Sequence, residues 1–458
     1  MAPERNIVII GGMACGPKTA ARARRRDANA RITMVEQGPT VSEGSCGLPY
    51  YMGGVIQSEK SLLIRTQQQF KEGSNVDVLG WTRATRIDRD ARKVELVDVN
   101  TGATSSLPYD KLVIATGAVP VVPASLEGTD LEGVFTLTKI ADANRIIAAL
   151  AAPDAKKAVV VGGGLIGMEA AEAFTDRGLD VSVVEALPHV LPGLLDEDMS
   201  APVEQELQDK GVHLFTGQRV VRLEGDAQGR VARVVTETST IEADVVLLAL
   251  GFRPNSGLAR DAGLEVGQLG GIVVNEFLQT SDPDIYAGGD CVENVHRVTE
   301  KSVFVPMGST ANKHGRIIGT NVTGGRDTFP GIVGTAVAKV FDMSVGRVGA
   351  SADEARAARF QPVIASGKGR DRAGYYPGAL ESTVKLVADA ATGRILGAQL
   401  VGFGDVSKRT DVLVTAISAE RTVDDLSNLD MAYAPPFSPA MDLLHDLANV
   451  IRGKIEKD

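Results

Sequence analysis

The chain of 458 residues has few cysteines, few aromatic residues and no long apolar run. Three cysteines are too few for a disulfide framework and are typical of a reducing compartment. No apolar run approaches the ~18 residues of a transmembrane helix, and the apolar pattern that begins at Ile7 runs directly into glycines, unlike a signal peptide. Basic residues number 48 against 58 acidic ones, and the net charge of −10 argues against binding to nucleic acid or anionic membranes. These absences predict a cytoplasmic, soluble protein.

One internal repetition dominates what the chain does contain. Residues 6–26 (NIVIIGGMACGPKTAARARRR) are echoed by residues 157–174 (KAVVVGGGLIGMEAAEAF). Each copy is a β-branched run followed by a glycine cluster and an alanine-rich helical pattern. A second apolar run then ends in an acid, Glu36 after the first copy and Glu185 after the second. The pattern predicts two βαβ nucleotide-binding units and therefore an α/β fold.

Turn signals and composition divide the chain further. The length predicts about three domains at roughly 100–200 residues each. Residues 1–118 and 254–325 are expected to form the two parts of the first nucleotide-binding domain, which encloses the second one at residues 119–253. The stretch TGGRDTFPG reads as a linker, and residues 330–458 mix strand and helix patterns, which predicts an α+β C-terminal domain.

The second glycine cluster fits the complete dinucleotide fingerprint. Gly162, Gly164 and Gly167 form G-x-G-x-x-G between a predicted strand and a predicted helix. Such glycines allow a tight turn, close approach of the backbone to a pyrophosphate, and close helix packing. Glu185 follows at about the distance expected of an acid that accepts from the ribose 2′-hydroxyl. A carboxylate there repels a 2′-phosphate, so the sequence predicts NADH rather than NADPH.

The first glycine cluster is less regular. Gly11 and Gly16 are present, but Met13 stands where the middle glycine belongs. Glu36 at the end of the next strand supports a nucleotide site, and two distant segments support it as well. Those segments are Ala115-Thr116-Gly117, directly after an apolar strand, and TSDPDIYAGGD, which ends in Asp290, a carboxylate suited to polyol hydroxyls.

In this order and spacing, the segments resemble the FAD-dependent pyridine nucleotide-disulfide oxidoreductases over essentially the whole chain. The resemblance implies that the first fold and Asp290 hold FAD and that the inserted second fold holds NAD(P)H. It also implies that the C-terminal domain forms a homodimer.

Cys46 decides which branch of that family the chain is most similar to. Many members carry C-x-x-x-x-C, but the positions five before and five after Cys46 are Val41 and Tyr51. A lone cysteine between Ser45 and Gly47, leading into a predicted helix, is expected to have a lowered pKa because helix N-terminal N–H groups favour a thiolate. The alternative is a buried cysteine that serves only packing.

The segment SCGLPYYMGG resembles the coenzyme A-disulfide reductase branch, in which one cysteine alternates between a thiol and a mixed disulfide with CoA. A related NADH oxidase and peroxidase branch oxidises its single cysteine to a sulfenate and carries a histidine in the first glycine loop. Ala14 occupies the matching position here, which points away from peroxide reduction.

A basic stripe and two serines are the predicted substrate contacts. Lys18, Arg22 and Arg25 fall at i, i+4 and i+7 of the first predicted helix and therefore share a face. The resemblance implies that this face binds the phosphates of CoA; the alternative is an ordinary solvated helix face. Ser42 and Ser45 are expected to lie beside the sulfur and to contact the pantetheine arm.

The motif MAYAPPFSPAMD resembles the terminal motif of the family. Many members have a His-Pro pair in this motif, whereas this chain has Tyr433 ahead of Ala434-Pro435. In the CoA branch a tyrosine at this site acts from the opposite subunit together with a second tyrosine from an earlier loop. RAGYYPGA offers Tyr375 and Tyr376, and Tyr375 is our prediction. A phenol with a pKa near 10 can stabilise or protonate a departing thiolate. The alternative for these residues is packing at an interface.

Three further residues are predicted to be structural: Cys15, Cys291 and His445. The five histidines show no metal-ligand spacing and C-x-x-C is absent, so no metal site is predicted. The predicted function is NADH-dependent, FAD-mediated reduction of a low-molecular-weight disulfide, persulfide or polysulfide, with CoA-linked substrates favoured. Two alternatives are an NADH oxidase that uses a cysteine sulfenate and a flavoprotein electron-transfer reductase for a protein partner.

Overall fold

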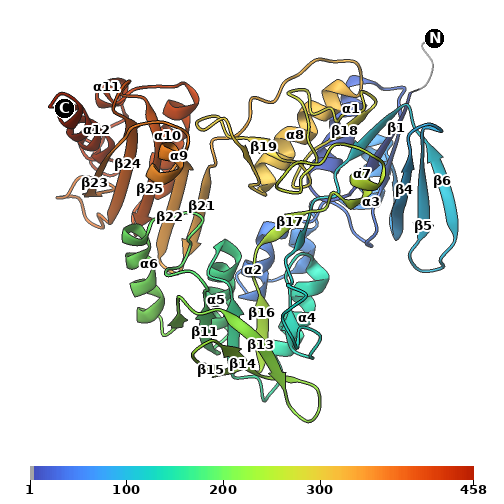
Figure 1. Cartoon of the computed structure of the whole chain (residues 1–458), viewed down its shortest axis with the longest axis horizontal. Coiled ribbons are helices and arrows are strands. Elements are labelled where there is room, and N and C mark those ends of the chain that lie inside the picture. The colour runs from blue at the N-terminus through green and yellow to red at the C-terminus, as the bar shows by residue number, and fades with distance from the viewer. Residues whose placement is uncertain (1–4, 458) are drawn as a thin grey trace.

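The computed structural model describes residues 5–457, and its parts follow one another along the chain (Figure 1). The N-terminal region lies at one end of the molecule and the C-terminal region at the other, with the inserted middle region below and between them. This arrangement confirms the predicted α/β fold with two nucleotide-binding units and an α+β C-terminal region.

The first sheet is parallel, with strand order β18-β7-β1-β2-β3. Ile7 of β1 pairs with Ile32 on one side and Lys111 on the other, and its side chain is 1% exposed. β-Branched residues fill such strands because a parallel sheet is buried on both faces. The strands span Asn6–Ile10 (β1), Arg31–Val35 (β2), Asp77–Leu79 (β3), Lys111–Ile114 (β7) and Ile285–Ala287 (β18).

The second sheet repeats this plan, with order β12-β11-β10-β16-β9. Here β10 plays the part of β1, since it pairs in parallel with β11 on one side and β16 on the other. The predicted internal repeat is therefore a repeat of structure. Its strands span Val134–Phe135 (β9), Lys157–Val161 (β10), Asp180–Val184 (β11), His213–Phe215 (β12) and Val245–Leu248 (β16).

The C-terminal sheet is antiparallel, with order β21-β22-β25-β24-β23. Helix α10 (Val406–Ser418) packs on β22 and β25, and α12 (Leu443–Ile455) packs on β23. The strands span Ala336–Val340 (β21), Met343–Gly349 (β22), Pro362–Arg370 (β23), Glu381–Asp389 (β24) and Ile395–Gly402 (β25). Short helices α9 (Ala352–Ala357) and α11 (Val423–Ser427) complete this region.

Helix α1 (Cys15–Arg26) lies directly against α8 (Gly308–Asn321). Two glycines of α8 make this close contact possible. A Cβ at Gly315 would lie 2.7 Å from the Cβ of Lys18, and a Cβ at Gly319 would lie 2.6 Å from the Cβ of Arg22. Larger residues at either glycine would push the two helices apart.

Smaller elements complete the chain. The remaining helices are α2 (Leu48–Met52), α3 (Gln67–Ser74), α4 (Ile140–Leu150), α5 (Leu165–Asp176), α6 (Glu197–Asp209) and α7 (Gly257–Asp261), with 3₁₀ turns at Ser45–Gly47 and Glu59–Leu62. Two antiparallel meanders are β4 (Thr82–Asp88), β5 (Lys93–Asp98), β6 (Thr104–Pro108) and β13 (Val220–Gly225), β14 (Val231–Thr236), β15 (Thr240–Glu242). Two strand pairs are β8 (Ala118–Pro120) with β17 (Phe252–Pro254), and β19 (Asn294–Val295) with β20 (Ser302–Val303).

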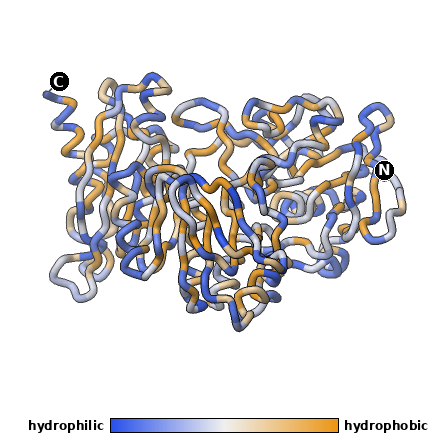
Figure 2. The backbone as a smooth tube through the Cα atoms, turned by 60° about the horizontal axis from the view of Figure 1, so that its bottom comes forward, coloured by the Kyte–Doolittle hydropathy of each residue, from blue (hydrophilic) through white to orange (hydrophobic). Residues whose placement is uncertain are grey.

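Hydrophobic segments are frequent in the interior of the molecule, and many of the outer loops are hydrophilic (Figure 2). Within residues 5–457, no helix is both long enough and apolar enough to cross a membrane.

Candidate active site

The first glycine loop turns sharply between β1 and α1. Gly11 has φ +112°, and a Cβ there would lie 2.1 Å from the carbonyl oxygen of Ala115. A Cβ at Gly16 would lie 1.9 Å from the carbonyl oxygen of Gly11. The carboxylate of Glu36 accepts from the N–H of Gly12 at 2.8 Å. Only glycine fits the first two positions, and Glu36 fixes the turn that they form.

The second loop repeats this geometry at its two outer glycines and at the terminal acid. Gly162 also has φ +112°, and a Cβ at Gly167 would lie 1.9 Å from the carbonyl oxygen of Gly162. Glu185 accepts from the N–H of Gly163 at 2.7 Å and from the N–H of Leu187 at 2.8 Å. The two predicted acids therefore stabilise their own glycine loops, a role that the sequence motif did not reveal.

The middle position of the motif explains why the first loop tolerates Met13. At the equivalent Gly164, a Cβ would find no atom of the chain within 4 Å. A side chain at this position therefore meets no steric conflict with the protein, in contrast to the outer two glycines. The irregular first motif is compatible with a nucleotide-binding turn.

Two further segments meet the first loop at the carboxyl edge of the sheet. Ala115, Thr116 and Gly117 follow β7, and the Thr116 hydroxyl donates to the carbonyl of Asn255 at 2.6 Å. Asp290 follows β18 and is half-buried. Burial raises the pKa of its carboxyl group, while the N–H of Met307 acts in the opposite direction. Because parallel strands end at one edge, these residues and the glycine loop surround a common region, as a dinucleotide cofactor requires.

Cys46 is exposed and lies in the 3₁₀ turn that leads into α2, a helix of five residues. A Cβ at Gly308, the first residue of α8, would lie 3.9 Å from its Sγ. The expected lowering of the thiol pKa is wrong for this chain. Partial burial of the sulfur, followed by the carboxylates of Glu169 and Asp290, raises the pKa of Cys46. The short helix supplies too little positive potential to reverse these effects.

The loop before Cys46 has a strained backbone. Ser42 has φ +57°, its N–H donates to the carbonyl of Gly12 at 2.7 Å, and Ser45 is exposed beside the sulfur. Glu43 between them is buried and accepts from the N–H of Ile140 at 3.1 Å, at the start of α4. Left-handed backbone at a non-glycine residue is characteristic of functional loops. Glu43 anchors this loop to the second domain, and no sequence motif indicated it.

The basic stripe lies partly in the seam between α1 and α8. Arg22 donates from Nε to the Thr320 hydroxyl at 3.0 Å, and Lys18 is half-buried beside Gly315. Arg25 is exposed in the last turn of α1. The stripe is therefore partly engaged by α8 rather than being a freely solvated face.

The two predicted tyrosines of the C-terminal domain lie side by side. The Tyr375 and Tyr433 hydroxyls are 3.4 Å apart, and this hydrogen bond raises the pKa of Tyr375. Their side chains are 76% and 51% exposed, and Phe437 nearby in sequence is 75% exposed. The C-terminal domain stands at the end of the molecule opposite α1 and β1 (Figure 1). These tyrosines are therefore exposed side chains of the C-terminal region, which lies at the other end of the molecule from α1 and β1.

Cys15, Cys291 and His445 have structural surroundings. Cys15 and Cys291 are buried, and burial raises the pKa of Cys291 to about 11. The Nδ1 of His445 accepts from the N–H of Asp442 at 3.2 Å, and its Nε2 lies 2.9 Å from the carbonyl oxygen of Leu429. Within the described residues, no group of three or more His, Cys, Asp or Glu side chains could hold a metal ion.

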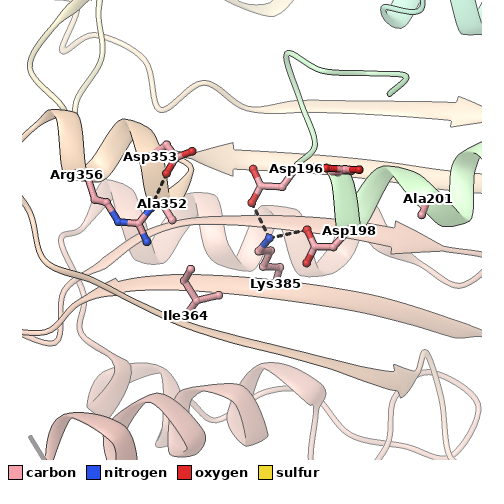
Figure 3. A pocket seen from close by; sticks show the side chains of 9 residues that line it. Asp196, Asp198, Ala201, Ala352, Asp353, Arg356, Ile364 and Lys385 are labelled. Carbon is pink, nitrogen blue, oxygen red and sulfur yellow. Dashed lines mark hydrogen bonds and ion pairs between the residues drawn. The ribbon is translucent and has the colours of Figure 1, made fainter. Parts of the chain in front are cut away.

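A cavity of about 670 Å³ lies between α6 and the C-terminal sheet (Figure 3). Lys385 projects between Asp196 and Asp198 and pairs with each at 2.7 Å, while Arg356 pairs with Asp353. None of the predicted site residues lines it. The cavity is an ion-paired contact between two domains rather than the reaction centre.

Sequence reasoning also missed Tyr50 and Glu169. The Tyr50 hydroxyl donates to the Glu169 carboxylate at 3.3 Å, from α2 to α5. Glu169 lies two residues after the last glycine of the dinucleotide motif, and Tyr50 lies one helical turn after Cys46. Their positions within these two motifs were the available signal.

The fold and the paired dinucleotide loops define a two-nucleotide oxidoreductase. The chain belongs to the pyridine nucleotide-disulphide oxidoreductase family, which matches residues 5–307, and residues 335–445 match the dimerisation domain of that family. The match confirms the resemblance drawn from the glycine motifs.

Several named proteins are similar along nearly the whole chain. A NAD-dependent persulfide reductase from A. fulgidus shares 46% identity with a TM-score of 0.96, over 99% of this chain and 84% of that chain. A Pyrococcus abyssi protein named NAD(P)H sulfur oxidoreductase (CoA-dependent) is 36% identical over 98% of both chains. A Methanocaldococcus jannaschii NADH oxidase is 35% identical over 94% of this chain and 95% of its own length.

Proposed function

We propose that this protein uses NADH and FAD to reduce a low-molecular-weight disulfide, persulfide or polysulfide through Cys46, with CoA-linked substrates favoured. The observation that carries the proposal is the placement of Cys46. It is the exposed one of three cysteines, its sulfur lies close to the start of α8, and the charge of Asp290 acts on the pKa of its thiol. The names of the A. fulgidus and P. abyssi relatives support sulfur chemistry of this kind.

The two glycine loops provide the cofactor sites in this proposal. FAD would be held by the Gly11–Gly16 loop, Glu36, Ala115–Gly117 and Asp290, and NADH by the Gly162–Gly167 loop and Glu185. Bound FAD supplies the redox group that takes two electrons from NADH and passes them on to sulfur. The chain itself positions the nucleotides and keeps Cys46 accessible to a small molecule.

The substrate side of the proposal rests on charge. Lys18, Arg22 and Arg25 offer cations to the phosphates of CoA, while Ser42 and Ser45 flank the sulfur on the path of the pantetheine arm. The Cys46 thiolate attacks the S–S bond of the substrate, forms a mixed disulfide and expels a thiolate. Two-electron reduction of the mixed disulfide then frees the second thiol and regenerates Cys46.

In this proposal the two tyrosines complete the active site of the other subunit of a homodimer. Because Tyr375 and Tyr433 are exposed and lie in the region that matches the dimerisation domain of the family, we infer that they serve the Cys46 of a second copy in a homodimer. In the hydrogen bond between the phenols, the hydroxyl that accepts keeps its own O–H free, and this proton suits protonation of a departing thiolate. We also propose a cytoplasmic location, because the low cysteine content is typical of a reducing compartment.

The decisive experiment compares C46S with C291A, a matched control that removes a buried thiol. C46S is expected to lose CoA-disulfide and CoA-persulfide turnover while NADH still bleaches the flavin, and C291A is expected to retain both. Intact mass without reductant, before and after NADH, identifies the modification on Cys46, where a CoA adduct supports the proposal. Full turnover by C46S would contradict it.

A second candidate is an NADH oxidase, favoured by the name of the M. jannaschii relative. In that case Cys46 would carry one added oxygen, and dioxygen consumption would exceed disulfide reduction. Ala14 supplies no acid–base group in the first glycine loop, which weighs against this candidate. An electron-transfer reductase for a protein partner would keep its activity in C46S.

A further inference from the structure

The segment Gly288–Asp290, which ends in the carboxylate assigned to FAD, is held between helices α1 and α8. A Cβ at Gly288 would lie 2.6 Å from Cδ1 of Ile318 in α8 and 3.1 Å from Sγ of Cys15 in α1. Gly289 has φ +80°, a conformation that residues other than glycine rarely adopt. Because the two glycines have no side chains of their own, groups on the neighbouring elements must fix their conformation.

His314 of α8 is a group that does so. Its Nδ1 accepts from the N–H of Gly289 at 3.1 Å, and its side chain is fully buried. Since Nδ1 accepts, the proton of the neutral ring lies on Nε2. Nε2 is buried and has no hydrogen-bond partner among residues 5–457. The ring of Phe329 lies perpendicular to the imidazole, with the two centroids 4.3 Å apart.

The unpaired Nε2 shows that His314 does more than fill space. A buried N–H without a partner costs free energy, and an aliphatic side chain would fill a similar volume without that cost. What the imidazole provides, and an aliphatic side chain cannot, is the acceptor for the Gly289 N–H. Burial, and then the charge of Lys313, lowers the pKa of His314 to about 4, so the ring is neutral near pH 7 and Nδ1 stays an acceptor.

We propose that His314 is a positioning residue of the FAD site, and that its neutral imidazole holds Gly288–Asp290, through the Gly289 N–H, in the conformation that binds FAD. The inference rests on the part of the proposed function that assigns Asp290 to FAD. In this role His314 sets the equilibrium between a held segment, which retains FAD, and an open segment, which releases it. The role is therefore measured as retention of FAD and does not require turnover.

The first test measures how fast the holoenzyme releases FAD, from the free FAD that passes an ultrafiltration membrane over time. H314L keeps an apolar side chain but leaves the Gly289 N–H unpaired, and we expect release about tenfold faster than in wild type. H314N places an amide oxygen where Nδ1 stood, so it should release FAD like wild type although it removes more volume. Release from H314L at the wild-type rate would overturn the proposal.

The matched control for general loss of packing is I317A, which removes buried volume from the same helix and leaves the Gly289 bond in place. It is expected to lower the melting temperature without accelerating release. The melting temperature and flavin spectrum of each variant verify that it is folded and loaded. If I317A accelerated release as much as H314L, the effect would be one of stability alone and the positioning role would be refuted.

The second test uses pH. In the open segment the solvated imidazole has its ordinary pKa near 6.5, whereas in the held segment this pKa is about 4. Acid therefore favours the open segment below about pH 6.5, and the effect is complete below about pH 4. We expect wild type to release FAD about tenfold faster at about pH 5.5 than at about pH 7.5, beyond any change in H314N, which has no imidazole to protonate.

Other ionisable groups on the elements around the ring titrate equally in both proteins, so the difference between wild type and H314N isolates His314. These groups are Lys313 on α8, Asp290 and Cys291 on the held segment, Cys15 and Lys18 on α1, and Arg326 and Asp327 beside Phe329. The same pH dependence in wild type and H314N would overturn the proposal.

The variant D290N separates this inference from the proposed function. Fast release from both D290N and H314L supports the inference. Fast release from D290N with wild-type release from H314L overturns the inference and leaves Asp290 as an FAD contact. Wild-type release from D290N contradicts the assignment of Asp290 and the inference with it. Disulfide turnover by C46S would contradict the proposed sulfur chemistry without altering FAD retention.

Discussion

The buried ion pair between Arg409 and Asp442 offers the sharpest test of how the C-terminal domain is held together. Arg409 on α10 is 3% exposed, and its Nε lies 3.0 Å from Oδ1 of Asp442. It also donates to the Ser382 hydroxyl and to the Arg370 carbonyl, each at 2.7 Å. Asp442 in turn accepts from the N–H of Leu444 at 3.0 Å and so caps α12. One guanidinium therefore joins a helix, two strands and the segment that follows Tyr433.

Breaking this pair on one side leaves a buried charge without its partner. We expect D442N, which keeps the shape of the side chain, to lower the free energy of unfolding of this domain by about 3–5 kcal/mol. The double variant R409M/D442L removes both charges and is expected to recover a large part of that loss. The matched control is R356M, which breaks an exposed pair with Asp353 and should cost less than about 1 kcal/mol.

Urea unfolding followed by circular dichroism gives the change in free energy, and hydrogen exchange of the α12 amides localises it. D442N is expected to raise exchange in α12 while leaving β1 and β10 protected. A D442N protein within about 1 kcal/mol of wild type, or a double variant less stable than D442N, would refute the reasoning from buried charge.

Three further predictions concern the second nucleotide loop and the cavity between domains. G167A should lower the melting temperature by an amount equivalent to about 1–3 kcal/mol, because its Cβ would overlap the backbone, whereas G164A should melt like wild type. E185A should reduce kcat/KM for NADH by about tenfold to a hundredfold and reduce it less for NADPH, and an unchanged ratio of the two coenzymes would contradict the role of this acid. Burial acts to raise the pKa of the Asp196 carboxyl group. Hydrogen bonds from Lys385 and Gln399 outweigh burial and hold this pKa below its usual value. The stability lost in K385M should therefore be evident above about pH 4 and fade as lower pH protonates Asp196 in both proteins, as thermal melts across that range would show.

The sequence alone was sufficient for features that depend on local pattern. β-Branched runs, glycine turns and terminal acids recur at fixed spacing, so both βαβ units and the positions of Gly11 and Gly162 could be predicted. The α+β character of the C-terminal region followed from its mixture of strand and helix patterns. These features are set by backbone sterics and strand burial, which neighbouring residues determine.

Features that depend on distant charge were not accessible in this way. The pKa of Cys46 was expected to be low because a helix follows it, yet α2 has only five residues and a carboxylate from α5 acts on the sulfur. The bond between Tyr50 and Glu169 spans 119 positions of sequence. The loop-bracing role of Glu185 was hidden for a different reason, since the motif indicates a ligand contact and says nothing of the backbone beside it.

The bracing of both glycine loops by Glu36 and Glu185 bears on how the protein acquires its nucleotides. Hydrogen bonds from the chain itself fix the shape of each loop, and a loop held in this way loses less conformational entropy on binding a dinucleotide, so more of the contact energy is retained as affinity. Each oxygen of these carboxylates accepts one hydrogen bond from a backbone N–H. A further lone pair on each oxygen can still accept from a ribose hydroxyl. A substitution of Glu185 that is meant to change the coenzyme preference must therefore replace two roles of this residue: its hydrogen bonds to the loop and its recognition of the ribose. A variant that replaces only the recognition role would bind its new coenzyme weakly.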